Sequence, residues 1–561
     1  PGREPAAHGV TTPGPTLRAN AVTALVLLLV ALSPWLLSGL VTLPHGDGWI
    51  LRDRAAAGAG WLWLEQPTRM FIYLPWRLVD LLSPSSFLAA HLLLIGAFWV
   101  KGLAFRASLA RVAPGLAPPT LAAALLIVYP ASTLAVSIDA SLDRHVALAF
   151  FLVAVWLFVR SLERPSRGVL AGMWAAQIAS LWSLELVLPL ALLVPLGLLW
   201  SQGQLLRSEA RRAALRWLAL PLANLAHNIV HILVTSRLSG TPLGASHARE
   251  MLSLDVGLGP AVESVAGALT GHLIDPWPGA LASVDSLGAG AFVAVAVAML
   301  ALTAGRLEPG FLPSWTIIGR VALAGAIAFA ATVVPMSLTL VRFDTGRSWI
   351  LSSLGATLIL VAAAATCARL ARRPGIARAV LTVVVALATV QTLAHHLRYV
   401  RGSDVIRRTL ASIVELIPEL APDTVLAVLW APDAVRPPGL GSRSGVLTHA
   451  VRFIYDDQTV LAGVGLPGRL RADDVTLGVG EESLVARFHG DGRVATFPYR
   501  RAILLDAESP DRMRLLEEFP ASVSAAARSS YHPRGRMSDG ALPSRAVALG
   551  LAPPTGGAEE R

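Results

Sequence analysis

Cysteine and lysine are almost absent from this 561-residue chain, which contains one residue of each type, Cys367 and Lys101. A single cysteine excludes an intrachain disulfide and any metal site built from several thiolates. Charged residues of all kinds are also scarce, at 15% of the chain, against about a quarter in soluble domains. Hydrophobic residues make up 54% of the sequence. Water alone therefore cannot be the solvent of the folded chain.

The formal net charge of +10 is unevenly distributed along the sequence. From Arg401 onward, basic and acidic residues are nearly equal in number, so the excess of arginine belongs to the preceding part of the chain. There it falls in short segments between hydrophobic runs and forms no continuous basic patch. Basic loops of a membrane protein explain this pattern, and nucleic-acid binding is not expected.

Separated hydrophobic runs, each long enough to cross a hydrocarbon core of about 30 Å, indicate a polytopic membrane protein. The run from 168 to 200 is too long for one span and is interrupted by Ser183, Glu185 and Pro189, so we expect two short helices there. The sequence thus predicts an all-α bundle of about eleven transmembrane helices. The other expected spans are residues 19–43, 86–105, 117–138, 144–162, 214–236, 287–305, 314–340, 347–369 and 376–396.

Arginine clusters set the expected orientation, because short cytoplasmic loops are enriched in Arg and Lys. Every cluster falls on one side of the membrane if the N-terminal tail, residues 1–18, is cytoplasmic. The opposite segments include outer loops at 44–85 and 237–286 and everything after about 397. We therefore expect a multi-pass protein of a bacterial inner membrane with its C-terminal part in the periplasm. The clusters are Arg106 and Arg111; Arg160, Arg164 and Arg167; Arg207, Arg211, Arg212 and Arg216; and Arg369, Arg372, Arg373 and Arg378.

The membrane part of the chain is expected over residues 19–396. The chain beyond it has the features of a small water-exposed domain. Ser403 precedes apolar residues at three-and-four spacing, which predicts a helix that begins at this N-cap and ends before Pro418. Short β-like runs follow, separated by Gly, Pro and Asp, and indicate a small soluble α/β or α+β C-terminal domain over 397–521. Residues 522–561 lack periodicity, so a flexible tail is expected there. The expected strands are 424–430, 445–455 and 483–490.

The first outer loop contains a carboxylate in an unusual setting, since Asp47 stands between two glycines shortly after the first hydrophobic run. A carboxylate held at the membrane surface can act as general base on an acceptor hydroxyl, or can bind a divalent cation beside a phosphate. The same loop contains Trp49, Trp61, Trp63 and Trp76, which suit a segment lying at the membrane interface. A membrane-anchoring loop with incidental charges is the alternative interpretation.

Further acidic residues lie where ionised groups are costly. Glu185 interrupts an apolar stretch, and a carboxylate in the hydrocarbon zone is usually functional or paired. Its alternative role is a structural ion pair or hydrogen bond with an arginine of an outer loop. Asp139 and Asp143 occupy a very short outer turn, where they either contribute to substrate binding or form a solvated turn with a helix N-cap.

Two further patterns suggest ligand binding. Arg342 and Arg347 flank an outer turn at the membrane boundary, where they can hold a lipid phosphate or can anchor helix ends by snorkelling. His227 and His231 are four residues apart in an expected span, the spacing of two metal ligands on a helix. No third ligand is near them in the sequence, so hydrogen bonding between helices is the favoured interpretation. No metal site is predicted from these histidines, and binding of a divalent cation at Asp47 is kept as an alternative.

Five segments occur in a recognisable order over residues 20–200. They are GDGW after the first span, PTRMFIYLPWRL, FLAAHLLLIGAF, AALLIVYPASTLAVSIDASLDRHVALAFF and LWSLELVLPLALLVP. This order resembles the superfamily of polytopic C-type glycosyltransferases, and more narrowly the bacterial relatives of the transmembrane O-mannosyltransferases. The resemblance implies a polyprenyl-phosphate sugar as the donor and Asp47 as the catalytic carboxylate. It also implies that Arg69, His91 and Glu185 lie near the donor or support the site.

The expected function is therefore transfer of a sugar from a polyprenyl-phosphate donor to an envelope glycan, lipid or protein acceptor on the periplasmic side. A non-catalytic scaffold protein of the envelope and a transporter or flippase are the alternatives. A transporter often shows internal repeats and polar residues through the membrane midplane. Here the acidic residues fall on one expected face of the membrane, and no internal repeat is found.

Overall fold

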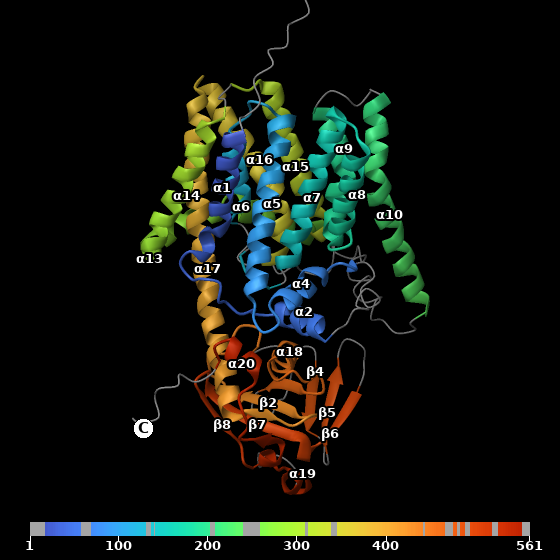
Figure 1. The fold of residues 1–561 in the computed structure, drawn as a ribbon, viewed down its shortest axis with the longest axis vertical. Coiled ribbons are helices and arrows are strands. Elements are labelled where there is room, and N and C mark those ends of the chain that lie inside the picture. The colour runs from blue at the N-terminus through green and yellow to red at the C-terminus, as the bar shows by residue number, and fades with distance from the viewer. Residues whose placement is uncertain are drawn as a thin grey trace, which may run out of the picture.

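The protein consists of a helical bundle and a smaller domain of mixed helices and strands, stacked end to end (Figure 1). The computed structural model describes residues 17–57, 69–130, 136–139, 141–201, 208–238, 258–308, 312–337, 345–440, 444–465, 475–479, 483–488, 494–518 and 525–551. The predicted architecture, an all-α polytopic bundle with a small C-terminal domain that contains β-sheet, is confirmed.

Seven helices in the described part of the chain are long and apolar enough to cross a membrane. Six of them are α1 (Leu17–Leu32, continued by the 3-10 helix η1, Ser33–Trp35), α5 (Leu88–Val112), α7 (Ser141–Glu163), α14 (Ala289–Arg306), α15 (Trp315–Ser337) and α16 (Thr345–Leu370). The seventh is α17 (Pro374–Leu416). The remaining bundle helices are α6 (Pro119–Ile127), α8 (Arg167–Leu181), α9 (Leu188–Ser201), α10 (Ser208–Leu238), α12 (Leu258–Leu273) and α13 (Pro276–Leu287).

The expected full span over 117–138 is wrong. Helix α6 ends at Ile127 after nine residues, which is about 14 Å of helix and too short to cross a membrane alone. Pro130 is the physical reason, because a proline lacks the N–H that a helix needs and disfavours helical geometry in the residue before it. The predicted pair of short helices over 168–200 is present as α8 and α9, separated by the 3-10 helix η3 (Glu185–Val187).

Helix α17 connects the two parts of the molecule. It contains 43 residues, about 65 Å of helix, and runs through the bundle into the C-terminal domain (Figure 1). The expected break between a span ending at 396 and a new helix capped by Ser403 is therefore wrong. The hydroxyl of Ser403 instead accepts a hydrogen bond from the backbone N–H of Leu43, 2.6 Å away. The helix ends at Leu416, as predicted from Pro418.

The C-terminal domain contains a four-stranded sheet in the order β3-β2-β7-β8. Strand β2 is parallel to β3 and β7, while β8 is antiparallel to β7, and α18 forms the connection from β2 to β3. The described residues of the domain also form an antiparallel sheet β4-β5-β6 and an antiparallel pair β1-β9. The strands are β1 (Glu419–Leu420), β2 (Val425–Trp430), β3 (Leu461–Gly465), β4 (Val475–Val479), β5 (Ser483–Phe488), β6 (Val494–Pro498), β7 (Ala502–Ser509), β8 (Arg512–Leu515) and β9 (Met537–Ser538).

Two sequence predictions for this domain are corrected. Residues 445–455 are not a strand, because Ser444–Tyr455 form helix α18. Its apolar residues Val446, Leu447, Ala450 and Val451 are all buried, the three-and-four spacing of one helical face. Residues 525–551 are not a loosely ordered tail, since they form α19 (Ala525–Ser530), η5 (Pro533–Arg536), β9 and α20 (Ser544–Ala548). Four apolar residues of this segment, Tyr531, Ala546, Leu549 and Leu551, are buried, and this burial orders it.

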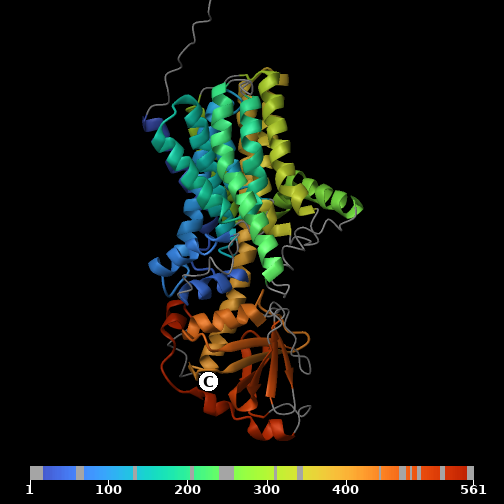
Figure 2. The same ribbon diagram turned by 90° about the vertical axis from the view of Figure 1, so that its right-hand side faces the viewer.

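Two short helices lie between the bundle and the C-terminal domain, and they place the candidate site at this junction (Figures 1 and 2). They are α2 (Asp47–Ala56) and α4 (Leu74–Leu82). The arginine-rich helix ends, such as the C-terminal ends of α5 and α7, lie at the opposite end of the bundle (Figure 1). This segregation agrees with the alternation used to predict topology, and the placement of each end relative to a membrane stays a prediction.

Candidate functional site

Asp47 is the first residue of α2 and lies at the junction of the bundle and the C-terminal domain. The following residue, Gly48, donates its backbone N–H to Oδ1 of Asp139 at 2.6 Å. A Cβ atom on Gly48 would lie 2.7 Å from Cβ of Pro44, so a larger residue does not fit there. The tight packing of Gly48 thus places two of the predicted acidic residues, Asp47 and Asp139, beside each other in space.

Asp143 belongs to the same cluster. It lies in the first turn of α7 and is 2% exposed. Its carboxylate interacts electrostatically with the guanidinium groups of Arg144 and Arg69 and with the carboxylate of Asp47. The cluster therefore combines acidic and basic groups at one end of the bundle, where two helices, α2 and α7, begin with their N-terminal N–H groups. Such helix ends favour negatively charged groups.

Arg69 and Glu185 form a two-point ion pair within this cluster. The distance between Nε of Arg69 and Oε2 of Glu185 is 2.5 Å, and Nη2 donates to Oε1. Burial disfavours the charged guanidinium, but the charge and hydrogen bonds of Glu185, together with the charges of Asp143 and Tyr73, outweigh this effect and raise the pKa of Arg69 above its usual value. The alternative proposed for Glu185, an ion pair with an arginine of an outer loop, is thus present. This pair fastens η3 to the segment before α4.

The structure therefore brings together five of the predicted site residues, Asp47, Asp139, Asp143, Arg69 and Glu185. It adds two groups that sequence reasoning did not assign to the site. Arg144 interacts with both Asp143 and Glu185, and its position next to Asp143 in the sequence was the available signal. Tyr399 of α17 interacts electrostatically with Asp139. No local pattern pointed to it, because the two residues are far apart in the sequence.

His91 has a different environment. Its Nδ1 accepts a hydrogen bond from Nε1 of Trp35 at 3.0 Å, and its Nε2 lies 3.3 Å from Oγ1 of Thr42. These contacts fasten α5 to the segment between α1 and α2. A role of His91 in donor binding stays a prediction. Arg342 lies outside the described residues, and of Arg347 only the backbone, in the first turn of α16, is described.

The described part of the chain contains no group of three or more His, Cys, Asp or Glu residues that could hold a metal ion. The predicted histidine pair lies on α10, where His227 and His231 interact electrostatically with each other. The ring of His227 packs edge-on against Trp182, with ring centroids 6.2 Å apart. His227 thus packs against the C-cap residue of α8, whereas its interaction with His231 lies within α10.

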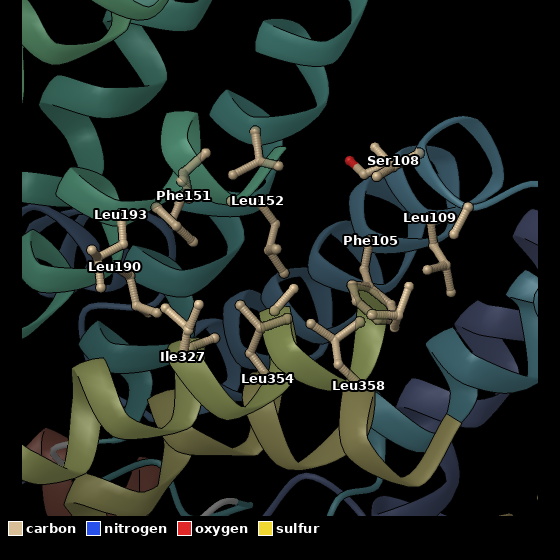
Figure 3. A pocket seen from close by; sticks show the side chains of 18 of the residues that line it. Phe105, Ser108, Leu109, Phe151, Leu152, Leu190, Leu193, Ile327, Leu354 and Leu358 are labelled. Atoms are coloured by element: carbon tan, nitrogen blue, oxygen red, sulfur yellow. The ribbon is translucent and has the colours of Figure 1, made fainter. Parts of the chain in front are cut away.

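An apolar pocket of about 160 Å³ lies within the bundle, between α5, α7, α9, α15 and α16 (Figure 3). Its wall consists almost entirely of aliphatic and aromatic side chains, among them Leu152, Leu193 and Leu354, and Arg320 is its charged lining residue. Ile327 is another of its lining residues and is 37% exposed. The pocket can hold a hydrocarbon chain and offers no acid–base chemistry.

No protein-family model and no curated protein sequence matches the chain. Among solved structures, the chain is similar to the crystal structure of ArnT from Cupriavidus metallidurans in the apo state. The identity is 16%, the TM-score is 0.36, and the match covers 79% of this chain and 84% of that chain. At this TM-score the likeness assigns neither a family nor an activity to the chain.

Proposed function

We propose that this protein is a membrane glycosyltransferase that transfers a sugar from a polyprenyl-phosphate donor to a glycan, lipid or protein acceptor at the periplasmic face. One observation carries the proposal: a cluster of carboxylates and guanidinium groups at one end of the bundle is connected by two helices to an apolar pocket. A lipid-linked sugar has the same two-part character, because a charged phosphate is joined to a long hydrocarbon chain.

The spacing along these helices supports a single ligand that spans both regions. Asp143 and the pocket residue Phe151 are eight positions apart on α7, about 12 Å along the axis. Glu185, the first residue of η3, and the pocket residue Leu190, in the first turn of α9, are five positions apart, about 8 Å. A phosphate held at the cluster would thus place its hydrocarbon chain beside the pocket.

The proposed reaction is a single displacement at the anomeric carbon of the donor sugar. Asp47 accepts the proton of the acceptor hydroxyl while the oxygen of that hydroxyl forms a bond to the anomeric carbon. The bond from this carbon to the phosphate oxygen breaks at the same time. The polyprenyl phosphate leaves with the electron pair of that bond. Arg144 lies in the cluster and can stabilise the negative charge that develops on the phosphate.

Transfer of label from donor to acceptor tests this proposal. Membranes that contain the protein, and matched membranes without it, would be incubated with polyprenyl-phosphate sugars labelled in the sugar, and the envelope glycans, lipids and proteins would be separated. Label that enters an acceptor only when the protein is present supports the proposal. Absence of transfer from every donor would contradict it and would favour a non-catalytic scaffold; label that crosses the membrane while still attached to its lipid would favour a flippase.

A further inference from the structure

We propose that the C-terminal domain holds α2 in place through His449 and Gln458, and thereby positions Asp47. This inference rests on the proposed function, because it assigns to these two residues a positioning role in sugar transfer. The evidence lies in the contacts between α2 and α18, which face each other across the junction of the two parts of the molecule (Figure 1).

Asp53 is the central residue of this contact. Its side chain lies on α2 and the residue is 1% exposed, an environment in which an unpaired carboxylate is costly. Both of its carboxylate oxygens form hydrogen bonds with side chains of the C-terminal domain. Nδ1 of His449 lies 2.7 Å from Oδ2, and Nε2 of Gln458 donates to Oδ1 at 2.7 Å. Helix α2 is therefore fastened to α18 and to the segment that follows α18.

Arg52, the neighbouring residue on α2, is fully buried and links the same contact to the bundle. It donates to Oδ1 of Asp80 at 2.6 Å and to the carbonyl oxygen of Ser83 at 2.8 Å. Its guanidinium also lies over the ring of Phe453 of α18, 4.9 Å from the ring centroid. Helix α2 thus has one charged side chain bound mainly to the α4 region and another bound to the C-terminal domain.

The segment that leads to Asp47 is held by α17 and by the same domain. The ring of His45 stacks on Tyr399 with centroids 3.9 Å apart, and its Nε2 lies 2.9 Å from the carbonyl oxygen of Tyr399. Gly439 of the C-terminal domain packs so closely that a Cβ atom there would lie 1.6 Å from the carbonyl oxygen of His45. Both ends of α2 are therefore constrained by residues from α17 and the C-terminal domain.

These contacts matter for catalysis because α2 is short. A helix of ten residues is marginal on its own, so tertiary contacts must hold it. Asp47 and Asp53 are six positions apart, about 9 Å along the axis. A tilt of about 10° at Asp53 would move Asp47 by about 1.6 Å, and a misplacement of about 1 Å can cost a hundredfold in rate.

The test compares Asp53→Asn, His449→Phe and the conservative His449→Gln in the full-length protein. The control is Glu517→Gln, which breaks the exposed ion pair of Glu517 with Arg534 in the same domain. Hydrogen exchange of the amides of 47–56 would be followed by mass spectrometry, with the amides of β2 as a measure of folding. Initial rates of sugar transfer would give kcat and the KM for the donor.

In Asp53→Asn and His449→Phe we expect exchange of the α2 amides to become at least tenfold faster while β2 is unchanged. We expect kcat to fall at least tenfold with the donor KM within twofold, and His449→Gln, which keeps a hydrogen-bond donor, to retain most of the activity. Unchanged exchange of α2 in both variants would overturn the inference, and so would faster exchange with unchanged kcat. Accelerated exchange in a protein whose wild type transfers no sugar would overturn the proposed function and leave the anchoring of α2 supported.

Discussion

The ion pair between Arg69 and Glu185 should stabilise the junction by a measurable coupling energy. Its two contacts are short, and the side chains are 23% and 17% exposed, so solvent screens the pair only in part. Two unit charges about 4 Å apart attract by about 4 kcal/mol at an effective dielectric constant of about 20. Desolvation of the two groups offsets part of this attraction. We therefore expect a net coupling of about 2 kcal/mol.

A double-mutant cycle measures this coupling. Arg69→Gln, Glu185→Gln and the double variant would be unfolded with SDS in mixed detergent micelles, and the free energy of unfolding would be determined for each. Each single variant leaves a charge without its partner, so each should lose about 3 kcal/mol, and the double variant should lose clearly less than the sum. A coupling energy below about 0.5 kcal/mol would show that the pair does not fasten η3 to the segment before α4, and would refute the reasoning.

Three other perturbations probe the junction and the pocket. Gly439→Ala forces a Cβ onto a backbone with φ of +72° and should cost more than about 1 kcal/mol of unfolding free energy, whereas Gly535→Ala meets nothing within 4 Å and should cost less than about 0.5 kcal/mol. Burial lowers the pKa of His45 to about 4, whereas the imidazole of the unfolded chain binds a proton near pH 6.5. The free energy of unfolding should therefore fall as the pH drops from 6.5 toward 4, because the unfolded chain binds more protons there, and it should fall less steeply in His45→Phe. Leu193→Trp fills the pocket and should raise the donor KM about tenfold with little change in kcat, while Leu281→Trp, on an exposed face of α13, should leave both unchanged.

Hydrophobic periodicity predicted the bundle because long apolar runs have few alternatives to a transmembrane helix. It failed where two signals competed. In α18, β-branched and aromatic residues such as Val451 and Phe453 favour a strand, whereas the spacing of the apolar residues favours a helix. The segment is a helix, and these residues are buried on one face of it. In α17, Ser403 has the chemistry of an N-cap, but its hydroxyl bonds to Leu43, so the helix continues through it.

Only those residues of the candidate site that are unusual in their local sequence could be predicted. Asp47 and Glu185 are such residues, because a carboxylate near the hydrocarbon zone is costly. The arginine that pairs with Glu185 lies 116 positions away, and no sequence rule selects it among the outer-loop arginines. Asp53 and His449, 396 positions apart, were not expected to meet, since their pairing depends on how α18 packs against α2.

The rate of sugar transfer by Asp47→Asn tests the central claim most directly. This variant keeps the size of the side chain and removes the base, and Asp404→Asn, which alters an exposed carboxylate of α17 paired with Arg407, is the matched control. With purified protein and a labelled polyprenyl-phosphate sugar, we expect Asp47→Asn to lose at least a hundredfold in kcat, while Asp404→Asn keeps wild-type activity. Transfer by Asp47→Asn at the wild-type rate would contradict the assignment of Asp47 as the base and, with it, the proposed site.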